Sequence, residues 1–150
     1  MAGIGMDGNK DREGGCLCGA VRYRVEGEPV RSSVCSCTFC QRRTGSAFGF
    51  GAYFNDTQVK ILRGELNMYE HRSDETGRWL RIQFCPKCGV QVTWTVEAMP
   101  GLRAVGVGTL DDPKSVKPMR FGWFRSAHPW LQPPEGVEVI HTSTLPPPPR

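Results

Sequence analysis

The chain carries, at positions 34–41, the run Val34-Cys35-Ser36-Cys37-Thr38-Phe39-Cys40-Gln41, which places three sulfur ligands within six residues. Thiolates are soft ligands that suit zinc, and short spacings allow several sulfurs to face one ion. The other four cysteines also come in pairs, Cys16/Cys18 and Cys85/Cys88, so that all seven belong to clusters. We therefore interpret the cysteines of this chain as metal ligands.

Length and composition favour a single domain of 150 residues with an ordinary apolar content of 39%. No run of about 18 apolar residues is present, which predicts that the chain does not span a membrane. The first residues lack the apolar core of a signal peptide, so we expect a cytoplasmic protein. In that compartment clustered cysteines bind metal more often than they form disulfides, and an odd number of them argues against a complete disulfide framework.

The formal charge of +4 counts each cysteine as neutral. Four thiolates on one zinc ion and three on another would bring the net charge down to about +1. Nucleic-acid binding requires a clear basic face, and the chain has no Lys/Arg run beyond Arg42-Arg43. A nucleic-acid partner is therefore not expected.

Short stretches with the alternation typical of half-buried strands fill much of the chain. The clearest are residues 21–26 and 90–96. Residues 41–45 favour one helical turn closed by Gly45. Because no long helical period is present, the chain is predicted to be all-β. Further strands are expected at 30–34, 48–54, 58–62, 66–70, 79–84 and 104–110, with weaker ones at 119–124 and 136–140.

Two local patterns indicate close approach of the backbone. In Cys85-Pro86-Lys87-Cys88-Gly89 the proline fixes a bend, and the glycine allows a tight turn whose N–H groups can donate to sulfur. In the strand at 48–54, the glycines leave one face thin, which indicates close approach of another backbone or of a ligand. The three histidines, His71, His128 and His141, are scattered. We interpret them as surface or loop residues rather than ligands.

Tetrahedral zinc takes four ligands, so seven cysteines suggest a group of four and a group of three. Two pairs far apart in sequence make the better structural site, because closing a long loop restricts the unfolded chain more. This reasoning assigns Cys16, Cys18, Cys85 and Cys88 to a closed structural site, and leaves Cys35, Cys37 and Cys40 as a local three-sulfur group. A different partition, with Cys35 or Cys40 in the closed site, remains open.

Functional zinc sites typically have three protein ligands and an open fourth position. Three thiolates reduce the Lewis acidity of the zinc ion, which makes activation of a bound water less favourable. We therefore expect an incoming thiol, rather than an activated water, as the fourth ligand. Arg42 and Arg43 follow the group and could hold carboxylates of such a guest, or be solvated surface residues. The alternative is that all seven cysteines are structural, with the three-sulfur group completed by a histidine or simply holding a loop.

Three stretches in order resemble the glutathione-dependent formaldehyde-activating enzyme family, which also includes a centromere protein of the V type. They are residues 15–23, 35–48 and 84–89, and residues 108–112 with Pro129-Trp130 are similar to downstream landmarks of the family. The resemblance implies an all-β, Mss4-like fold of short antiparallel sheets around a structural zinc. It implies that this zinc is held by Cys16, Cys18, Cys85 and Cys88, and that a second, labile zinc is held by Cys35, Cys37 and Cys40.

For function, the resemblance implies a carbon–sulfur lyase-type reaction in which glutathione adds to formaldehyde, with Cys35, Cys37 and Cys40 as the catalytic centre. The alternatives are a thiol-binding carrier without catalysis, and a zinc-stapled interaction module whose proline tail docks on a partner. The expected division is a disordered N-terminus at 1–13, the zinc domain at 14–141 and a proline-rich tail at 142–150.

Overall fold

Two β-sheets and a short α-helix make up the described part of the chain, residues 10–142 of the computed structural model. This architecture confirms the all-β prediction. None of the helices in these residues is long and apolar enough to cross a membrane. The elements are β1 (Arg12–Gly15), β2 (Arg22–Val25), β3 (Arg31–Cys35), α1 (Thr38–Thr44), β4 (Gly49–Asn55), η2 (Asp56–Gln58), β5 (Val59–Arg63), β6 (Asn67–Arg72), β7 (Trp79–Phe84), β8 (Gln91–Val96), β9 (Leu102–Gly106), η3 (Val107–Thr109), η4 (Pro113–Ser115), β10 (Arg120–Gly122), η5 (Phe124–Ser126) and β11 (Glu138–Val139).

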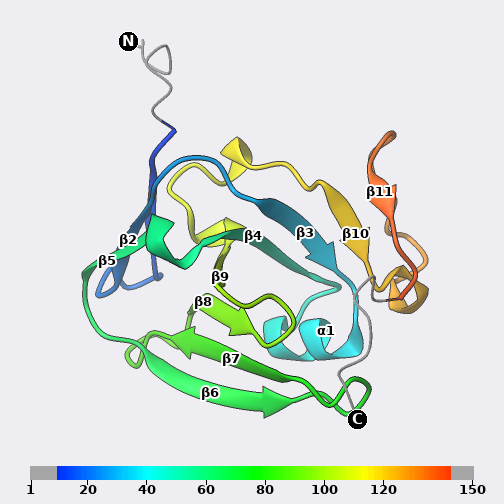
Figure 1. The fold of residues 1–150 in the computed structure, drawn as a ribbon, viewed down its shortest axis with the longest axis horizontal. Coiled ribbons are helices and arrows are strands. Elements are labelled where there is room, and N and C mark those ends of the chain that lie inside the picture. The colour runs from blue at the N-terminus through cyan, green and yellow to red at the C-terminus, as the bar shows by residue number, and fades with distance from the viewer. Residues whose placement is uncertain (1–9, 143–150) are drawn as a thin grey trace.

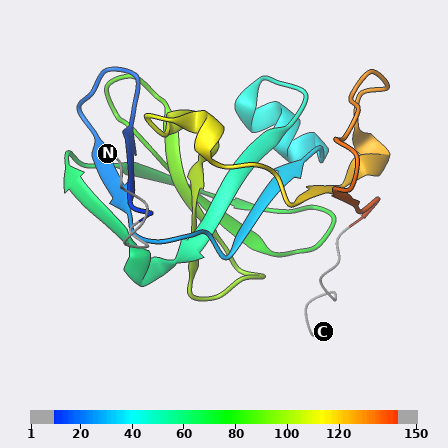
Figure 2. The ribbon, with the colours of Figure 1, turned by 90° about the horizontal axis from the view of Figure 1, so that it is seen from above.

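The smaller sheet has the strand order β1-β2-β5, and the larger one has the order β11-β10-β3-β4-β9-β8-β7-β6. Neighbouring strands are antiparallel, except that β10 is parallel to both β3 and β11. In Figures 1 and 2 the smaller sheet lies at one end of the molecule, while α1 lies over the other part, near the ends of β3 and β4. The two ends of the larger sheet thus face different surroundings.

The main hydrophobic core joins the two sheets and is built from alternating strand residues. In and next to β2, Val21, Tyr23 and Val25 are fully buried, as the alternation predicts. A second, smaller cluster lies beside α1, with Ile82, Trp94 and Ala104 packed against partly buried Phe39, Tyr53 and Val96. The remaining buried members of the main core are Cys16, Ala52, Phe54, Cys85, Val92, Val105, Val107, Leu110 and Val116.

The structure departs from the predicted pattern at several elements, three of them strands. Strand β8 is covered on both faces at its centre, because the buried Thr93 hydroxyl donates to Gln83 Oε1 at 2.8 Å. The strand expected over 104–110 ends at Gly106 and continues as the turn η3, stabilised by a hydrogen bond from Thr109 Oγ1 to Gly106 O. Strand β1 begins at Arg12, two residues before the expected start of the zinc domain. The proline run at 146–149 lies outside the described residues.

Candidate metal centres and pocket

Two similar turns bring four cysteines together in what we call the anchor cluster: Cys16, Cys18, Cys85 and Cys88. The first turn follows β1 and the second follows β7. Each is closed by a backbone hydrogen bond across five residues, from Cys16 N to Val21 O at 3.1 Å and from Cys85 N to Val90 O at 3.0 Å. The glycine in each turn adopts a left-handed conformation, with φ of 81° at residue 19 and 78° at residue 89.

The spacing of the anchor sulfurs fits one tetrahedral ion. All four Sγ atoms lie within 4.8 Å of one another. The Sγ atoms of Cys16 and Cys18 are 3.6 Å apart, and those of Cys18 and Cys85 are 3.8 Å apart. Tetrahedral zinc with bonds of about 2.3 Å would place its sulfurs about 3.8 Å from one another. The anchor cluster therefore has the ligands and the spacing to hold a zinc ion.

Backbone N–H groups also prepare the anchor sulfurs for negative charge. Val21 N donates to Cys16 Sγ at 3.3 Å and Lys87 N donates to Cys85 Sγ at 3.4 Å, as the glycine-containing turn predicts. Burial raises the pKa of Cys16, but the Val21 N–H and the hydrogen bonds of the other three sulfurs outweigh it and bring that pKa to about 6. Such hydrogen bonds stabilise thiolates, which are the form that binds metal.

The second group, which we call the claw, consists of Cys35, Cys37 and Cys40. Cys35 ends β3, where it pairs with Gly49 of β4 and with Gly122 of β10. Cys37 is the N-cap of α1, and its sulfur accepts a hydrogen bond from Cys40 N at 3.3 Å. The helix is longer than the single turn predicted at 41–45, because it begins inside the cysteine motif; it ends at Gly45 as expected.

The claw sulfurs are close enough to share one ion, since all three lie within 4.8 Å of one another. Hydrogen bonds with Cys35 and Cys37 lower the pKa of the Cys40 thiol well below its usual value, the Arg43 guanidinium lowers it further, and burial opposes both. Hydrogen bonds with Cys37 and Cys40, together with burial, raise the pKa of Cys35. The Cys40 thiol, beside Arg43, therefore loses its proton more readily than the Cys35 thiol.

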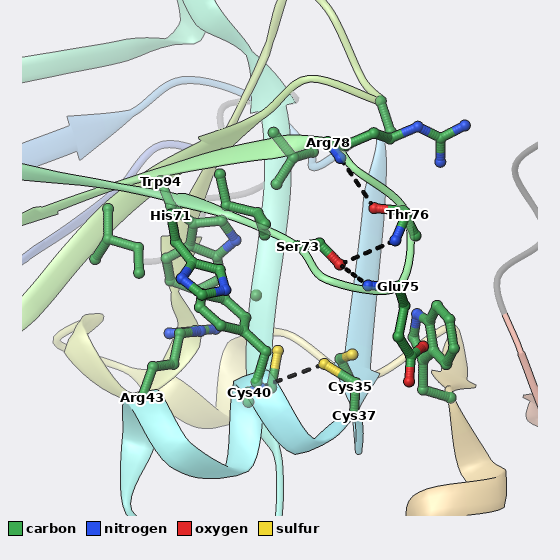
Figure 3. A pocket seen from close by; sticks show the side chains of 18 of the residues that line it. Cys35, Cys37, Cys40, Arg43, His71, Ser73, Glu75, Thr76, Arg78 and Trp94 are labelled. Atoms are coloured by element: carbon green, nitrogen blue, oxygen red, sulfur yellow. Dashed lines mark hydrogen bonds between the residues drawn. The ribbon is translucent and has the colours of Figure 1, made fainter. Parts of the chain in front are cut away.

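The claw opens into a cavity of about 470 Å³, whereas no anchor cysteine lines it. Figure 3 shows the three sulfurs at one side of the cavity and the loop that carries Ser73, Glu75 and Thr76 across from them. One part of the wall is apolar and belongs to the second hydrophobic cluster, and another part is charged. The apolar wall includes Phe39, Tyr53, Leu80, Ile82, Trp94 and Val96. What we call the charged wall comes from two elements, with Arg42 on α1 and Asp74, Glu75 and Arg78 on the loop after β6.

Two glycines of β4 leave space on the face of the strand that borders this cavity. The neighbours that fill this space differ from those we expected. A Cβ atom at Gly49 would come within 2.7 Å of Arg43 Nη2, and one at Gly51 would come within 2.5 Å of Trp94 Cζ2. The thin face of this strand therefore receives two side chains, neither a backbone nor a ligand. Cys35 faces this same surface through its pairing with Gly49.

One of the histidines belongs to the pocket, contrary to our interpretation of all three as surface or loop residues. His71 lies in β6, lines the cavity and stacks on Phe39 with ring centroids 4.5 Å apart. The potential metal-binding groups within residues 10–142 contain cysteine alone. His128 Nε2 lies 3.1 Å from Gln41 Oε1, and His141 packs edge-on against Phe124.

Sequence reasoning found every sulfur of the two clusters but missed the walls of the pocket. Trp94 had a usable signal, since it lies in the alternating stretch at 90–96. His71 had none, because the other residues of β6 are exposed and show no alternation. The loop at 73–78 had none, because its role depends on where the β6–β7 hairpin ends relative to the claw.

Comparison with known proteins relates the chain to a protein family and to a solved structure. The model of the glutathione-dependent formaldehyde-activating enzyme family matches residues 11–126. The crystal structure of a Rhodobacter sphaeroides protein, solved as a structural-genomics target, superimposes with a TM-score of 0.54 at 27% sequence identity. That alignment covers 71% of this chain and 91% of the other.

Proposed function

This chain belongs to the glutathione-dependent formaldehyde-activating enzyme family, and on that premise we propose that it is a zinc-dependent carbon–sulfur lyase-type enzyme. It forms or cleaves the adduct of glutathione, or of another thiol, with an aldehyde. In the forward direction the sulfur bonds to the aldehyde carbon, the carbon–oxygen π bond opens, and the thiol proton ends on the oxygen. The reverse direction releases thiol and aldehyde.

The observation that carries this proposal is the contrast in ligand number between the clusters. Four sulfurs surround the anchor, whereas three sulfurs line the cavity of the claw. A zinc ion held by the claw would supply a fourth position for a soft ligand such as a thiolate. The claw residues hold their sulfurs at the cavity wall, so a guest thiol that enters there meets them directly.

The charged wall of the cavity suits a glutathione-like guest. Glutathione carries two carboxylates and one ammonium group, and the cavity is lined by two arginines, Arg42 and Arg78, and by the carboxylates of Asp74 and Glu75. Arginine recognises carboxylates in a planar, bidentate manner. The apolar wall excludes water from the remainder of the cavity, and holding thiol and aldehyde together there is the main expected source of rate enhancement.

Exchange NMR on an equilibrium mixture of formaldehyde and glutathione tests the reaction itself. We expect the zinc-loaded protein to accelerate interconversion of free and thiol-bound formaldehyde, and Cys37→Ser to remove the acceleration. Cys37 suits this test because it is half-buried and caps a short helix, so that serine can replace it as a cap. An exchange rate equal to that without protein, with the claw metal-loaded, contradicts the proposal.

The second candidate, a carrier that binds thiols without catalysis, is favoured by the same open claw. It predicts glutathione binding by calorimetry that Cys37→Ser abolishes, together with an unchanged exchange rate. The third, an interaction module that uses the proline tail, depends on residues beyond those described. Truncation after residue 144 tests it, since unchanged partner capture would remove the tail from consideration.

A further inference from the structure

Arg42 and Arg43 are neighbours on α1, but the structure gives them different surroundings. Arg42 is exposed at the edge of the cavity. Arg43 is half-buried, and its guanidinium lies over the ring of Trp94 at 4.3 Å from the centroid. Figure 3 shows the Arg43 side chain rising from the helix beside Cys40 toward Trp94. Of these two neighbours, Arg42 is thus solvated, whereas Arg43 is fixed in the wall of the cavity.

Contacts of both its side chain and its backbone hold Arg43 in place. Its Nη1 donates to Gln91 Oε1 at 2.9 Å, and Gln91 Nε2 donates back to the Arg43 carbonyl at 2.7 Å. Its Nη2 fills the space that the absent side chain of Gly49 leaves, and the Cβ of Cys40 borders the same space. An arginine that is stacked and hydrogen-bonded in this way has few other orientations, so its charge stays beside the claw.

Charge counting shows why the claw needs a fixed cation. Three thiolates around a divalent ion carry a net charge of about −1, and a fourth thiolate makes it about −2. In a half-buried site that second negative charge is costly unless an opposite charge lies near. Among the residues that line the cavity, Arg43 is the cation that packs against a claw cysteine, while Arg42 and Arg78 lie at its charged wall.

We propose that Arg43 is the positioning residue that allows the claw to accept a thiolate guest, because its fixed charge offsets the negative charge that the guest adds to the cysteine sulfurs. This inference rests on the proposed function and sharpens it: the guest is an anionic sulfur ligand, and a neutral donor of similar size gains nothing from Arg43. This role differs from both that the sequence left open for Arg43, a contact with a carboxylate of the guest and a solvated surface position.

Calorimetry on the zinc-loaded full-length protein with two thiols distinguishes these roles. Glutathione carries carboxylates, and 2-mercaptoethanol carries none. We expect Arg43→Met to weaken the binding of both thiols by about tenfold or more, the effect of removing one close opposite charge from an ionised group. We expect Arg43→Lys, which keeps the charge but loses the stacked guanidinium, to weaken the binding of both thiols clearly less than Arg43→Met does.

The matched variant is Arg42→Met, which removes an exposed charge one residue away. It should change the affinity for 2-mercaptoethanol by less than about twofold, since solvent screens an exposed charge. It should lower the affinity for glutathione, because Arg42 can hold a carboxylate of that thiol. Zinc content and thermal unfolding of each variant report whether the claw and the fold survive.

Three outcomes overturn the inference. Equal loss in Arg43→Lys and Arg43→Met would show that Arg43 acts through packing. Loss confined to glutathione would show that it binds a carboxylate. Unchanged affinity in Arg43→Met would show no role. Failure of the wild-type protein to bind either thiol with zinc in the claw contradicts the proposed function itself, and is distinguishable from all three.

Discussion

The anchor cluster and the claw use the same ligand atom in opposite ways. The anchor joins two turns that are 67 residues apart, between Cys18 and Cys85, and Cys16 and Cys85 belong to the main core. The claw is confined to six residues at the junction of β3 and α1, and it borders a cavity. Long-range ligation by four sulfurs suits stabilisation, and local ligation by three suits exchange with a guest.

The largest expected effect is on stability, and it tests this division directly. Cys85→Ala removes a fully buried anchor ligand and should lower the free energy of unfolding by about 3 kcal/mol or more, because zinc binding at such a site is part of the folding free energy. Cys37→Ala in the claw should cost about 1 kcal/mol, the value of a lost helix cap. Thermal unfolding of both zinc-loaded variants measures the difference. Equal destabilisation would contradict the assignment of a structural role to the anchor alone.

The next effect concerns the apolar wall beside the claw. Gly51→Ala places a Cβ 2.5 Å from Trp94 Cζ2, so the indole must move, and we expect a cost of about 1–3 kcal/mol together with weaker thiol binding. The matched control is Gly108→Ala, where nothing lies within 4 Å of the added atom; we expect less than about 0.5 kcal/mol there. Similar values for the two variants would show that the wall adapts freely.

A third prediction compares how well the two regions exclude water, using one tyrosine in each, fully buried in the main core and partly buried beside the claw. Burial raises the pKa of Tyr23 in the main core and of Tyr53 beside the claw, each to about 12. Because the usual value is about 10, both stabilising contributions are complete below pH 10 and are lost as the pH rises through 12. The free energy of unfolding should therefore fall as the pH rises from 9 to 12.

The matching variants are Tyr23→Phe and Tyr53→Phe, and each should flatten part of that fall. At neutral pH, Tyr53→Phe also leaves the Trp94 Nε1–H without its acceptor, now 3.1 Å away, at a cost of about 1 kcal/mol. A fall that neither variant alters would show that other groups control the alkaline transition.

The smallest effect is expected at the mouth of the cavity. Glu75, in the loop of the charged wall, pairs with Arg125 at 3.2 Å, and both side chains are more than half exposed. Exposed ion pairs contribute about 0–1 kcal/mol, so Glu75→Gln should change the stability by less than about 1 kcal/mol, and salt should reduce the difference further. A larger change in thermal unfolding would indicate that this contact holds the loop in place.

The two clusters also differ in how far the sequence predicted them. The claw is local, so its spacing alone places three sulfurs together. The anchor required the pairing of two distant turns, which came from counting ligands and was supported by the family resemblance. Strand β2 was predicted correctly because Val21, Tyr23 and Val25 all point into one core. The expected alternation of buried and exposed residues breaks down at Thr93, because Gln83 and Arg103 cover the second face of β8 there.

The walls of the pocket escaped prediction for a physical reason. Arg43 and Trp94 meet only because β4 and β8 are both neighbours of β9 and two glycines thin the surface of β4. The sequence contains the glycines and the tryptophan, but the long-range strand order that joins them is a property of the folded sheet. For the same reason, Arg42 and Arg43 could not be told apart before their surroundings were known.

Zinc content per chain, before and after mild chelation, tests the central claim most directly. The account predicts that the wild-type protein binds two ions, loses the claw ion to the chelator and keeps the anchor ion with its fold. Cys35→Ser should begin with one ion and keep it under the same conditions. Loss of both ions together, or retention of both, would contradict the division of the seven cysteines into a closed anchor and an open claw.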